Sequence, residues 1–177
     1  MTRALVVYES MFGNARAVAQ AIADGLSATV PTDVVAAAEA PAEIPADVGL
    51  LVVGGPNHAF SMPRPATRQS AVTQHGADVA DTSRGLREWL AAVHAPTRGL
   101  PAAAFDTRVA GHPALTRMDH AARATEKLLG KLGTRVAAPA EHFAVADTRG
   151  PLVAGEQDRA RRWGRELAER VHTTAAS

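Results

Sequence analysis

The sequence predicts an α/β protein in which helices cover both faces of a parallel β-sheet. Three observations predict it. Short apolar runs alternate with helical patterns along all 177 residues, residues 48–53 are apolar without a break, and the helical segments carry one apolar stripe each. An unbroken apolar strand is typical of a sheet covered on both faces, and the alternation is typical of βαβ units. We expect a single domain over residues 1–177.

Five strands can be placed from the apolar runs. They are expected at residues 3–8, 32–37, 48–53, 101–105 and 134–145. The second is only weakly apolar, which favours a position at the edge of the sheet. The third is the clearest and ends at a Gly-Gly-Pro sequence. The fifth is expected to be interrupted at Pro139, because proline has no N–H to donate to a neighbouring strand.

Five helices are expected between and after these strands. Four of them carry apolar residues that are expected to face the core, in three cases three or four positions apart. These residues are Val18, Ile22 and Leu26; Leu86, Trp89, Leu90 and Val93; Met118, Leu128, Leu129 and Leu132; and Trp163, Leu167 and Val171. The fifth is a short helix at about residues 65–74. The helix that contains Trp89 is expected at residues 84–93. The helix that contains Met118 is expected at residues 114–132, with Gly133 as its stop.

Right-handed crossovers give this series of elements a five-stranded sheet of order 2-1-3-4-5. Ligands of such sheets bind beyond the carboxyl ends of the strands, at the point where the strand order reverses. Three loops should meet there: residues 9–15, 55–68 and 106–113.

The first of these loops has the composition of an anion site. Residues 8–15 read Tyr-Glu-Ser-Met-Phe-Gly-Asn-Ala and follow directly on the first strand. The N–H groups in the first turn of a helix have no partners within the helix and attract anions, phosphate above all. A simple strand-to-helix turn is the alternative, because glycine and asparagine suit turns.

The same loop resembles that of the flavodoxins, which wrap a Ser/Thr-x-Thr-Gly-x-Thr sequence around the phosphate of FMN. Ser10, Gly13 and Asn14 match this pattern. Phe12 and Ala15 stand where hydroxyls are expected, so Met11, Phe12 and Ala15 would contribute backbone N–H groups. The resemblance implies a flavodoxin-like three-layer α/β/α sandwich with FMN as cofactor.

The second loop resembles the Gly-x-Pro-Thr-x-x-x-x-Met loop of flavodoxin-like NAD(P)H:quinone oxidoreductases. Pro56 and Met62 match the proline and methionine of this pattern, and Asn57 replaces its threonine. The resemblance implies that Pro56, Asn57, His58 and Phe60 flank the flavin ring. The alternatives are a core position for Phe60 and a surface position for His58.

For the third loop, the resemblance implies that Asp106, Thr107 and Arg108 lie at the polar edge of the flavin. Flavodoxins commonly place a tyrosine here, but Tyr8 is the only tyrosine in the chain. A guanidinium beside the ring would stabilise the reduced anion, so we expect a less negative potential than in acidic flavodoxins. Alternatively, Arg108 pairs with Asp106 or another carboxylate.

Composition disfavours most other functions. The net charge is +1, from 19 Lys+Arg and 18 Asp+Glu, which gives no general attraction for nucleic acid or an anionic membrane. Cysteine is absent, so disulfides, thiolate catalysis and iron–sulfur clusters are excluded. The seven histidines have no metal-binding spacing, and neither a Walker loop, a G-x-G-x-x-G fingerprint nor a G-x-S-x-G elbow occurs. A receiver domain would need an aspartate after the third strand, where Gly54 and Gly55 stand.

The expected function is therefore electron transfer through bound FMN, either to a redox partner protein or to a small acceptor such as a quinone. Whether the protein is an enzyme stays open, and the alternative is a flavin-free flavodoxin-like binding or regulatory module. A homodimer is compatible with the reductase type. No apolar run is long enough for a signal peptide or a membrane span, so we expect a cytoplasmic protein.

Overall fold

A parallel sheet lies at the centre of the computed structural model, which describes residues 3–57, 62–79, 81–95, 97–111 and 121–175. Within these residues the strands are β1 (Arg3–Tyr8), β2 (Thr32–Ala36), β3 (Val48–Pro56), β4 (Pro101–Val109), β5 (Arg135–Val136) and β6 (Glu141–Val145). Their order is β2-β1-β3-β4-β5, and β6 also pairs with β4. All pairs are parallel. The predicted order and the edge position of the second strand are confirmed.

The predicted fifth strand is present in two parts. β5 pairs with the start of β4, at Pro101 and Ala102, and β6 pairs with its end, from Phe105 to Val109. Pro139 lies between the two parts, as the missing N–H of proline requires.

The predicted carboxyl ends of the third and fourth strands are wrong. β3 continues through Gly54 and Gly55 to Pro56, and β4 continues through Asp106, Thr107 and Arg108 to Val109. Asp106–Arg108 were expected in a loop because they are polar. Pairing with β3 on one side and β6 on the other supplies their backbone partners and keeps them in the sheet.

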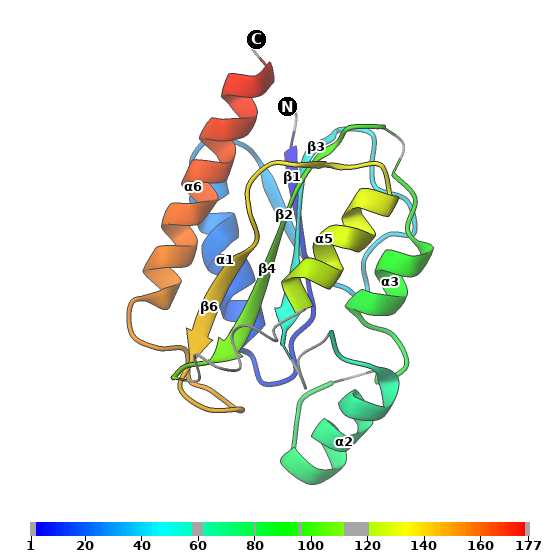
Figure 1. The fold of residues 1–177 in the computed structure, drawn as a ribbon, viewed down its shortest axis with the longest axis vertical. Coiled ribbons are helices and arrows are strands. Elements are labelled where there is room, and N and C mark those ends of the chain that lie inside the picture. Colours follow the sequence, from blue (N-terminus) through cyan, green and yellow to red (C-terminus); the bar gives the residue numbers. More distant parts are fainter. Residues whose placement is uncertain (1–2, 58–61, 80, 96, 112–120, 176–177) are drawn as a thin grey trace.

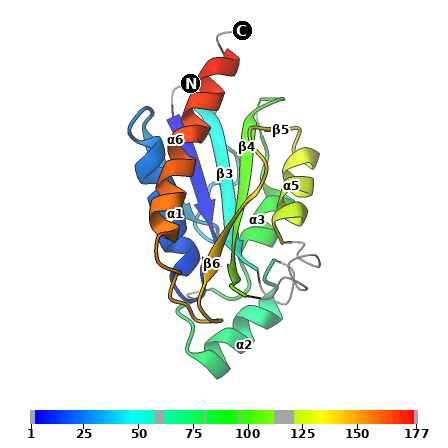
Figure 2. The same ribbon diagram turned by 60° about the vertical axis from the view of Figure 1, so that its left-hand side comes forward.

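Helices cover both faces of the sheet, as expected. They are α1 (Asn14–Leu26), α2 (Pro65–His75), α3 (Leu86–Ala92), α5 (Ala121–Lys131) and α6 (Glu156–Ala175). α1 and α6 lie side by side on one face, and α3 and α5 lie on the other (Figures 1 and 2). The first part of the predicted helix 114–132, with Met118, falls on residues 112–120, outside the described residues.

The central strands are buried on both faces because alternate side chains enter different cores. Val6 and Val52 pack with α1 and α6, whereas Val7 and Val53 pack with α3 and α5. The predicted inward residues Ile22, Leu26, Trp89, Leu129 and Leu167 are all buried. The apolar patterns therefore predicted the layers correctly.

Two glycines allow α1 and α6 to approach closely. A Cβ atom on Gly25 would lie 2.1 Å from the Arg161 carbonyl oxygen, and one on Gly164 would lie 2.2 Å from that of Ile22. Backbone therefore packs directly against backbone where α1 crosses α6.

α2 stands apart from the two helical layers. It lies beyond the carboxyl ends of the strands, at the lower end of the molecule in Figures 1 and 2. The short helix predicted at about residues 65–74 is confirmed. Among the described helices, none combines the length and the apolar character that crossing a membrane requires.

Candidate functional site

The loop between β1 and α1, residues 9–13, leads into a helix whose N-terminus has no side-chain cap. α1 begins after Gly13, whose φ of 85° and ψ of −18° place it in the left-handed region, and no side chain caps the helix. Within the described part of the chain, the backbone N–H groups of residues 10–16 donate no hydrogen bond. Seven successive donors at the positive end of a 13-residue helix are therefore available to an anion.

Two side-chain oxygens at this site also lack a partner among the described residues. The Ser10 hydroxyl oxygen and the Asn57 side-chain carbonyl oxygen are both shielded from solvent without a hydrogen bond. Buried polar atoms are nearly always paired in folded proteins. Their position beside the free N–H groups indicates a ligand with both acceptor and donor groups.

Both oxygens border a cavity of about 230 Å³ at the carboxyl ends of the central strands. The lining residues come from four segments that are far apart in the sequence: Ser10, Met11, Phe12, Asn14 and Ala15; Pro56 and Asn57; Thr107, Arg108 and Val109; and Val145 and Thr148. The cavity thus lies where β1, β3, β4 and β6 end, beside the reversal of strand order between β1 and β3.

Nine of the thirteen residues predicted for the site line this cavity. They are Ser10, Met11, Phe12, Asn14, Ala15, Pro56, Asn57, Thr107 and Arg108. Gly13 lines a neighbouring cavity, and Asp106 lies beneath the site with 1% of its surface exposed. His58 and Phe60 lie outside the described residues, so their predicted contacts with a ring stay predictions.

The Asn14 side chain has a structural partner. Its amide donates a hydrogen bond to the carbonyl oxygen of Arg149 at 3.0 Å, and a Cβ atom on Gly150 would lie 2.4 Å from the Asn14 side-chain oxygen. Asn14 therefore ties the start of α1 to the loop after β6, which leaves its backbone N–H as the group available to an anion.

Arg108 is paired rather than free to act on a ring. Its Nε atom lies 3.5 Å from Oδ1 of Asp106, and Nδ1 of His142 lies 2.9 Å from the same oxygen. Because the buried Asp106 carboxylate balances the guanidinium, the structure favours the alternative in which Arg108 pairs with Asp106. A paired guanidinium gives less support to the expectation of a less negative flavin reduction potential.

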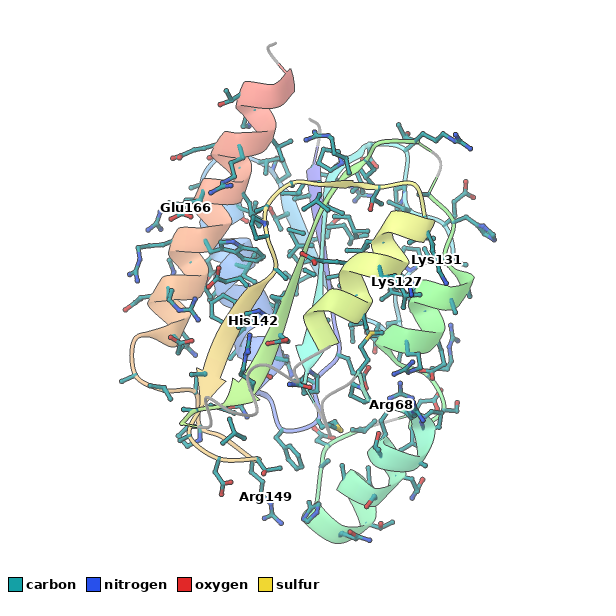
Figure 3. All side chains as sticks on the ribbon, in the orientation of Figure 1. Arg68, Lys127, Lys131, His142, Arg149 and Glu166 are labelled. Atoms are coloured by element: carbon teal, nitrogen blue, oxygen red, sulfur yellow. The ribbon has the colours of Figure 1, made fainter. Side chains whose placement is uncertain are left out.

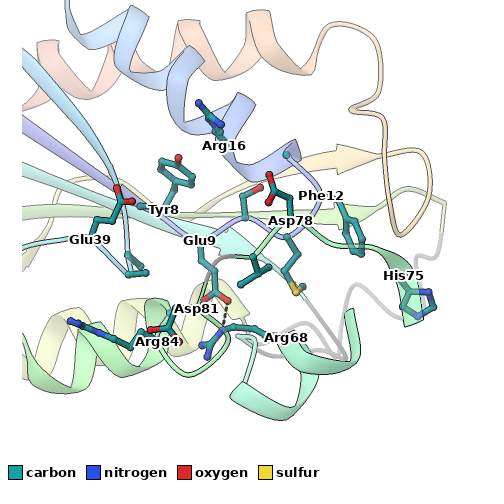
Figure 4. A pocket seen from close by; sticks show the side chains of 18 of the residues that line it. Tyr8, Glu9, Phe12, Arg16, Glu39, Arg68, His75, Asp78, Asp81 and Arg84 are labelled. Carbon is teal, nitrogen blue, oxygen red and sulfur yellow. Dashed lines mark hydrogen bonds and ion pairs between the residues drawn. The ribbon is translucent and has the colours of Figure 1, made fainter. Parts of the chain in front are cut away.

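A larger cavity of about 720 Å³ lies on the other side of the β1–α1 loop (Figure 4). Ser10, Met11 and Phe12 border both cavities, so the loop forms the wall between them. The other lining residues are mainly residues 36–39, at and just after the end of β2, and the segment that follows α2.

A buried ion pair that the sequence interpretation missed lies at the base of the larger cavity. Arg68 of α2 is 1% exposed and its Nε atom lies 2.7 Å from Oε1 of Glu9. Burial disfavours the Arg68 charge, but the hydrogen bonds and charges of Glu9 and Glu88 outweigh it and raise the guanidinium pKa above its ordinary value. The only sequence signal was an acidic residue directly after a buried strand, which does not identify its cation.

The donor set of the site suits an anion and not a metal ion. N–H groups, a hydroxyl and an amide surround the smaller cavity. Among the described residues, no three carboxylate or imidazole side chains gather closely enough to hold a metal.

Comparison with known proteins agrees with this geometry. The flavodoxin family model matches residues 6–63, which contain the β1–α1 loop and the end of β3. A search of curated protein sequences finds no match.

Solved structures match nearly the whole chain. A flavodoxin from the domain Archaea is 18% identical, with 97% of this chain and 99% of that chain covered and a TM-score of 0.61. A flavodoxin from Streptococcus pneumonia TIGR4 is 13% identical, with 98% and 99% covered and a TM-score of 0.63. A flavodoxin, WrbA-like protein from Agrobacterium tumefaciens is 14% identical, with 98% and 99% covered and a TM-score of 0.60.

At these identities the structural matches establish the fold, and the family match covers the anion loop itself. The sheet order and the two helical layers agree with them. The chain has a flavodoxin-like fold.

Proposed function

We propose that this protein binds FMN at the smaller cavity and carries electrons, delivering them to a partner protein or to a small acceptor such as a quinone. The observation that carries the proposal is the row of free N–H groups at residues 10–16 beside the unpartnered Ser10 hydroxyl. This donor set fits the phosphate of FMN, and the family match over the same residues supports it.

The chain's own groups have distinct tasks in this proposal. The N–H groups of residues 10–16 and the Ser10 hydroxyl donate to the phosphate. Asn57, at the end of β3, offers its side-chain oxygen to an N–H group of the flavin. When bound, FMN supplies the redox chemistry, so the protein needs to bind and orient it rather than to provide a catalytic acid or base.

The departures at Phe12 and Ala15 are compatible with phosphate binding. A hydroxyl at either position would add one donor to a cradle that already has seven free N–H groups. Backbone N–H groups at a helix N-terminus are sufficient to hold phosphate in many proteins.

The visible spectrum of the purified protein, before and after addition of FMN, tests the proposal. We expect a flavin spectrum and quenching of FMN fluorescence on binding. The variant Ser10→Ala should bind FMN about tenfold more weakly, because a hydrogen bond to a charged group is lost. Ser27→Ala, at an exposed position after α1, serves as its control.

A colourless protein that leaves FMN fluorescence unchanged would contradict the proposal. It would favour the flavin-free binding or regulatory module instead.

Turnover distinguishes the two electron acceptors. A quinone reductase should oxidise NADH or NADPH continuously when a quinone is present. The buried Met62, in step with the quinone reductase pattern, supports this type. A carrier would show bound FMN but negligible turnover with quinone.

A further inference from the structure

The segment between β3 and α3 packs against the β1–α1 loop at two separate points. It comprises residues 62–79 and 81–85 and includes α2. We call this segment the clamp. We propose that the clamp holds the β1–α1 loop in its phosphate-binding shape before the phosphate arrives, with Arg68 as its main positioning residue. This inference rests on the proposed FMN site and adds how that site is held ready.

The first contact is the buried ion pair between α2 and the end of β1. Arg68 Nε donates to Glu9 Oε1 at 2.7 Å, and the Leu86 N–H donates to Glu9 Oε2 at 2.8 Å. Glu9 is 7% exposed. Both carboxylate oxygens are therefore fixed at the residue that directly precedes Ser10.

Arg68 is itself held on every side. Its terminal nitrogens donate to the carbonyl oxygens of Thr82 and Pro63, at 3.0 and 3.3 Å, and to Glu88 at 2.6 Å. A Cβ atom on Gly85 would lie 2.3 Å from one of these nitrogens, so any other residue at position 85 would require the guanidinium to shift. Figure 4 shows Arg68 reaching Glu9 beneath the loop. The loop is thus connected to α2 and α3 through one rigid side chain.

The second contact is a small apolar cluster at the other end of the loop. Met11 is buried against Ala71 and Ala77 of the clamp, and Phe12 packs on the same cluster. The Asp78 N–H donates to the Met11 carbonyl oxygen at 3.2 Å. This contact explains why Phe12 replaces a hydroxyl residue, since its side chain packs on the clamp.

The loop needs these outside contacts because it has few bonds of its own. Among the described residues, the N–H groups at residues 10–16, which would otherwise stabilise a turn, have no partner. A loop with exposed donors would otherwise have to be ordered when it binds, at a cost in affinity. Two contacts, one polar and one apolar, remove that cost in advance.

A substitution in the clamp that leaves every residue of the loop unchanged tests the inference. Ala71 lies on α2, is 1% exposed and lines neither cavity. Ala71→Asp should disrupt the Met11 cluster. Arg68→Lys should remove the hydrogen bond that Arg68 Nε donates to Glu9. Ala66→Asp introduces the same charge at an exposed position of the same helix and is the matched control.

Two readouts are needed. In FMN titrations, Ala71→Asp and Arg68→Lys should raise the Kd at least tenfold, mainly through slower association, whereas Ala66→Asp stays within twofold of the wild type. In the apoprotein, hydrogen exchange at the Asp78 amide should become at least tenfold faster in Ala71→Asp, relative to the Ala137 amide, which bonds Ala102 across the sheet.

The outcomes separate this inference from the proposed function. If the wild type binds FMN and both clamp variants bind it within twofold, the clamp inference is overturned. Unchanged relative exchange at Asp78 overturns it as well. If the wild type binds no FMN, the proposed function fails, and the exchange comparison still decides whether the clamp holds the loop.

Discussion

Gly13 is the residue whose backbone conformation most directly shapes the anion site. Its φ of 85° is in the left-handed region, and a Cβ atom there would meet nothing within 4 Å. Gly13→Ala should therefore cost about 1 kcal/mol of stability through backbone strain alone. It should also weaken FMN binding, because relief of the strain turns N–H groups of the loop away from the phosphate. Urea unfolding and FMN titration measure the two effects.

Gly99→Ala is the matched control for this substitution. Gly99 has a φ of 78° and open space around its Cβ position, and it precedes β4 at the amino end of the sheet. The strain and the loss of stability should be similar, but FMN affinity should not change. Equal loss of FMN affinity in the two variants would show that Gly13 acts on binding only through general stability.

At the scale of elements, the crossing of α1 and α6 depends on small residues. Gly164→Ala should destabilise the protein by about 1–3 kcal/mol, because the added methyl group would overlap the Ile22 carbonyl oxygen. The usual helix preference for alanine over glycine, about 1 kcal/mol, works in the opposite direction. Thermal and urea unfolding of the variant measure the balance.

Gly130→Ala gives the comparison without overlap. Gly130 lies in α5 with nothing within 4 Å of its Cβ position. Alanine should stabilise the protein there by about 0.5–1 kcal/mol. If Gly164→Ala also stabilised the protein, α1 and α6 would have to move apart easily. That result would contradict their close packing.

The start of α6 closes the open edge of β6 with a charged group. Glu156 accepts the Ala144 N–H at 2.7 Å and two bonds from Arg159, at 2.7 and 3.0 Å. The bond from Arg159 is the largest cause that lowers the pKa of Glu156 below its ordinary value. The Arg159 guanidinium also lies 4.4 Å from the centre of the Phe143 ring. This end of the sheet is therefore covered rather than left free to pair with another chain.

The lowered pKa gives a pH-dependent prediction. A carboxyl whose folded pKa is depressed contributes stability above its unfolded pKa, about 4.3, and loses it as the pH falls through the folded value. Glu156→Gln should cost about 1–2 kcal/mol at pH 7, and the difference from the wild type should shrink below about pH 4.

The control for this prediction is Glu166→Gln. Glu166 is exposed on the same helix (Figure 3), so its substitution should change stability by less than about 0.5 kcal/mol at any pH. A cost for Glu156→Gln that stayed constant down to pH 3 would exclude an ionic role.

At the scale of the whole molecule, the apolar pattern determined most of what could be predicted. Adjacent residues such as Val6 and Val7 enter opposite cores, and an unbroken apolar run encodes that arrangement directly. The loop at residues 8–15 could be located because strand, glycine and helix follow each other locally.

What could not be predicted depends on partners distant in the sequence. Asp106 is buried within β4, where its Oδ1 lies 3.5 Å from Arg108 Nε and 2.9 Å from His142 Nδ1. Arg68 is buried because it meets Glu9, 59 residues away. From the sequence, both polar residues would be predicted at the surface or in a loop. Their charged partners come close to them only in the folded chain.

The proposed FMN site predicts, by mass action, how the whole fold responds to FMN. FMN at about 100 times its Kd should stabilise the protein by about 2.7 kcal/mol, which raises the Tm of a domain of this size by about 5–10 °C. Riboflavin has the same ring without the phosphate and cannot use the free N–H groups of residues 10–16. Thermal unfolding followed by circular dichroism should therefore show a much smaller shift with riboflavin at the same concentration. Equal shifts would place the main binding energy at the ring and not at the β1–α1 loop.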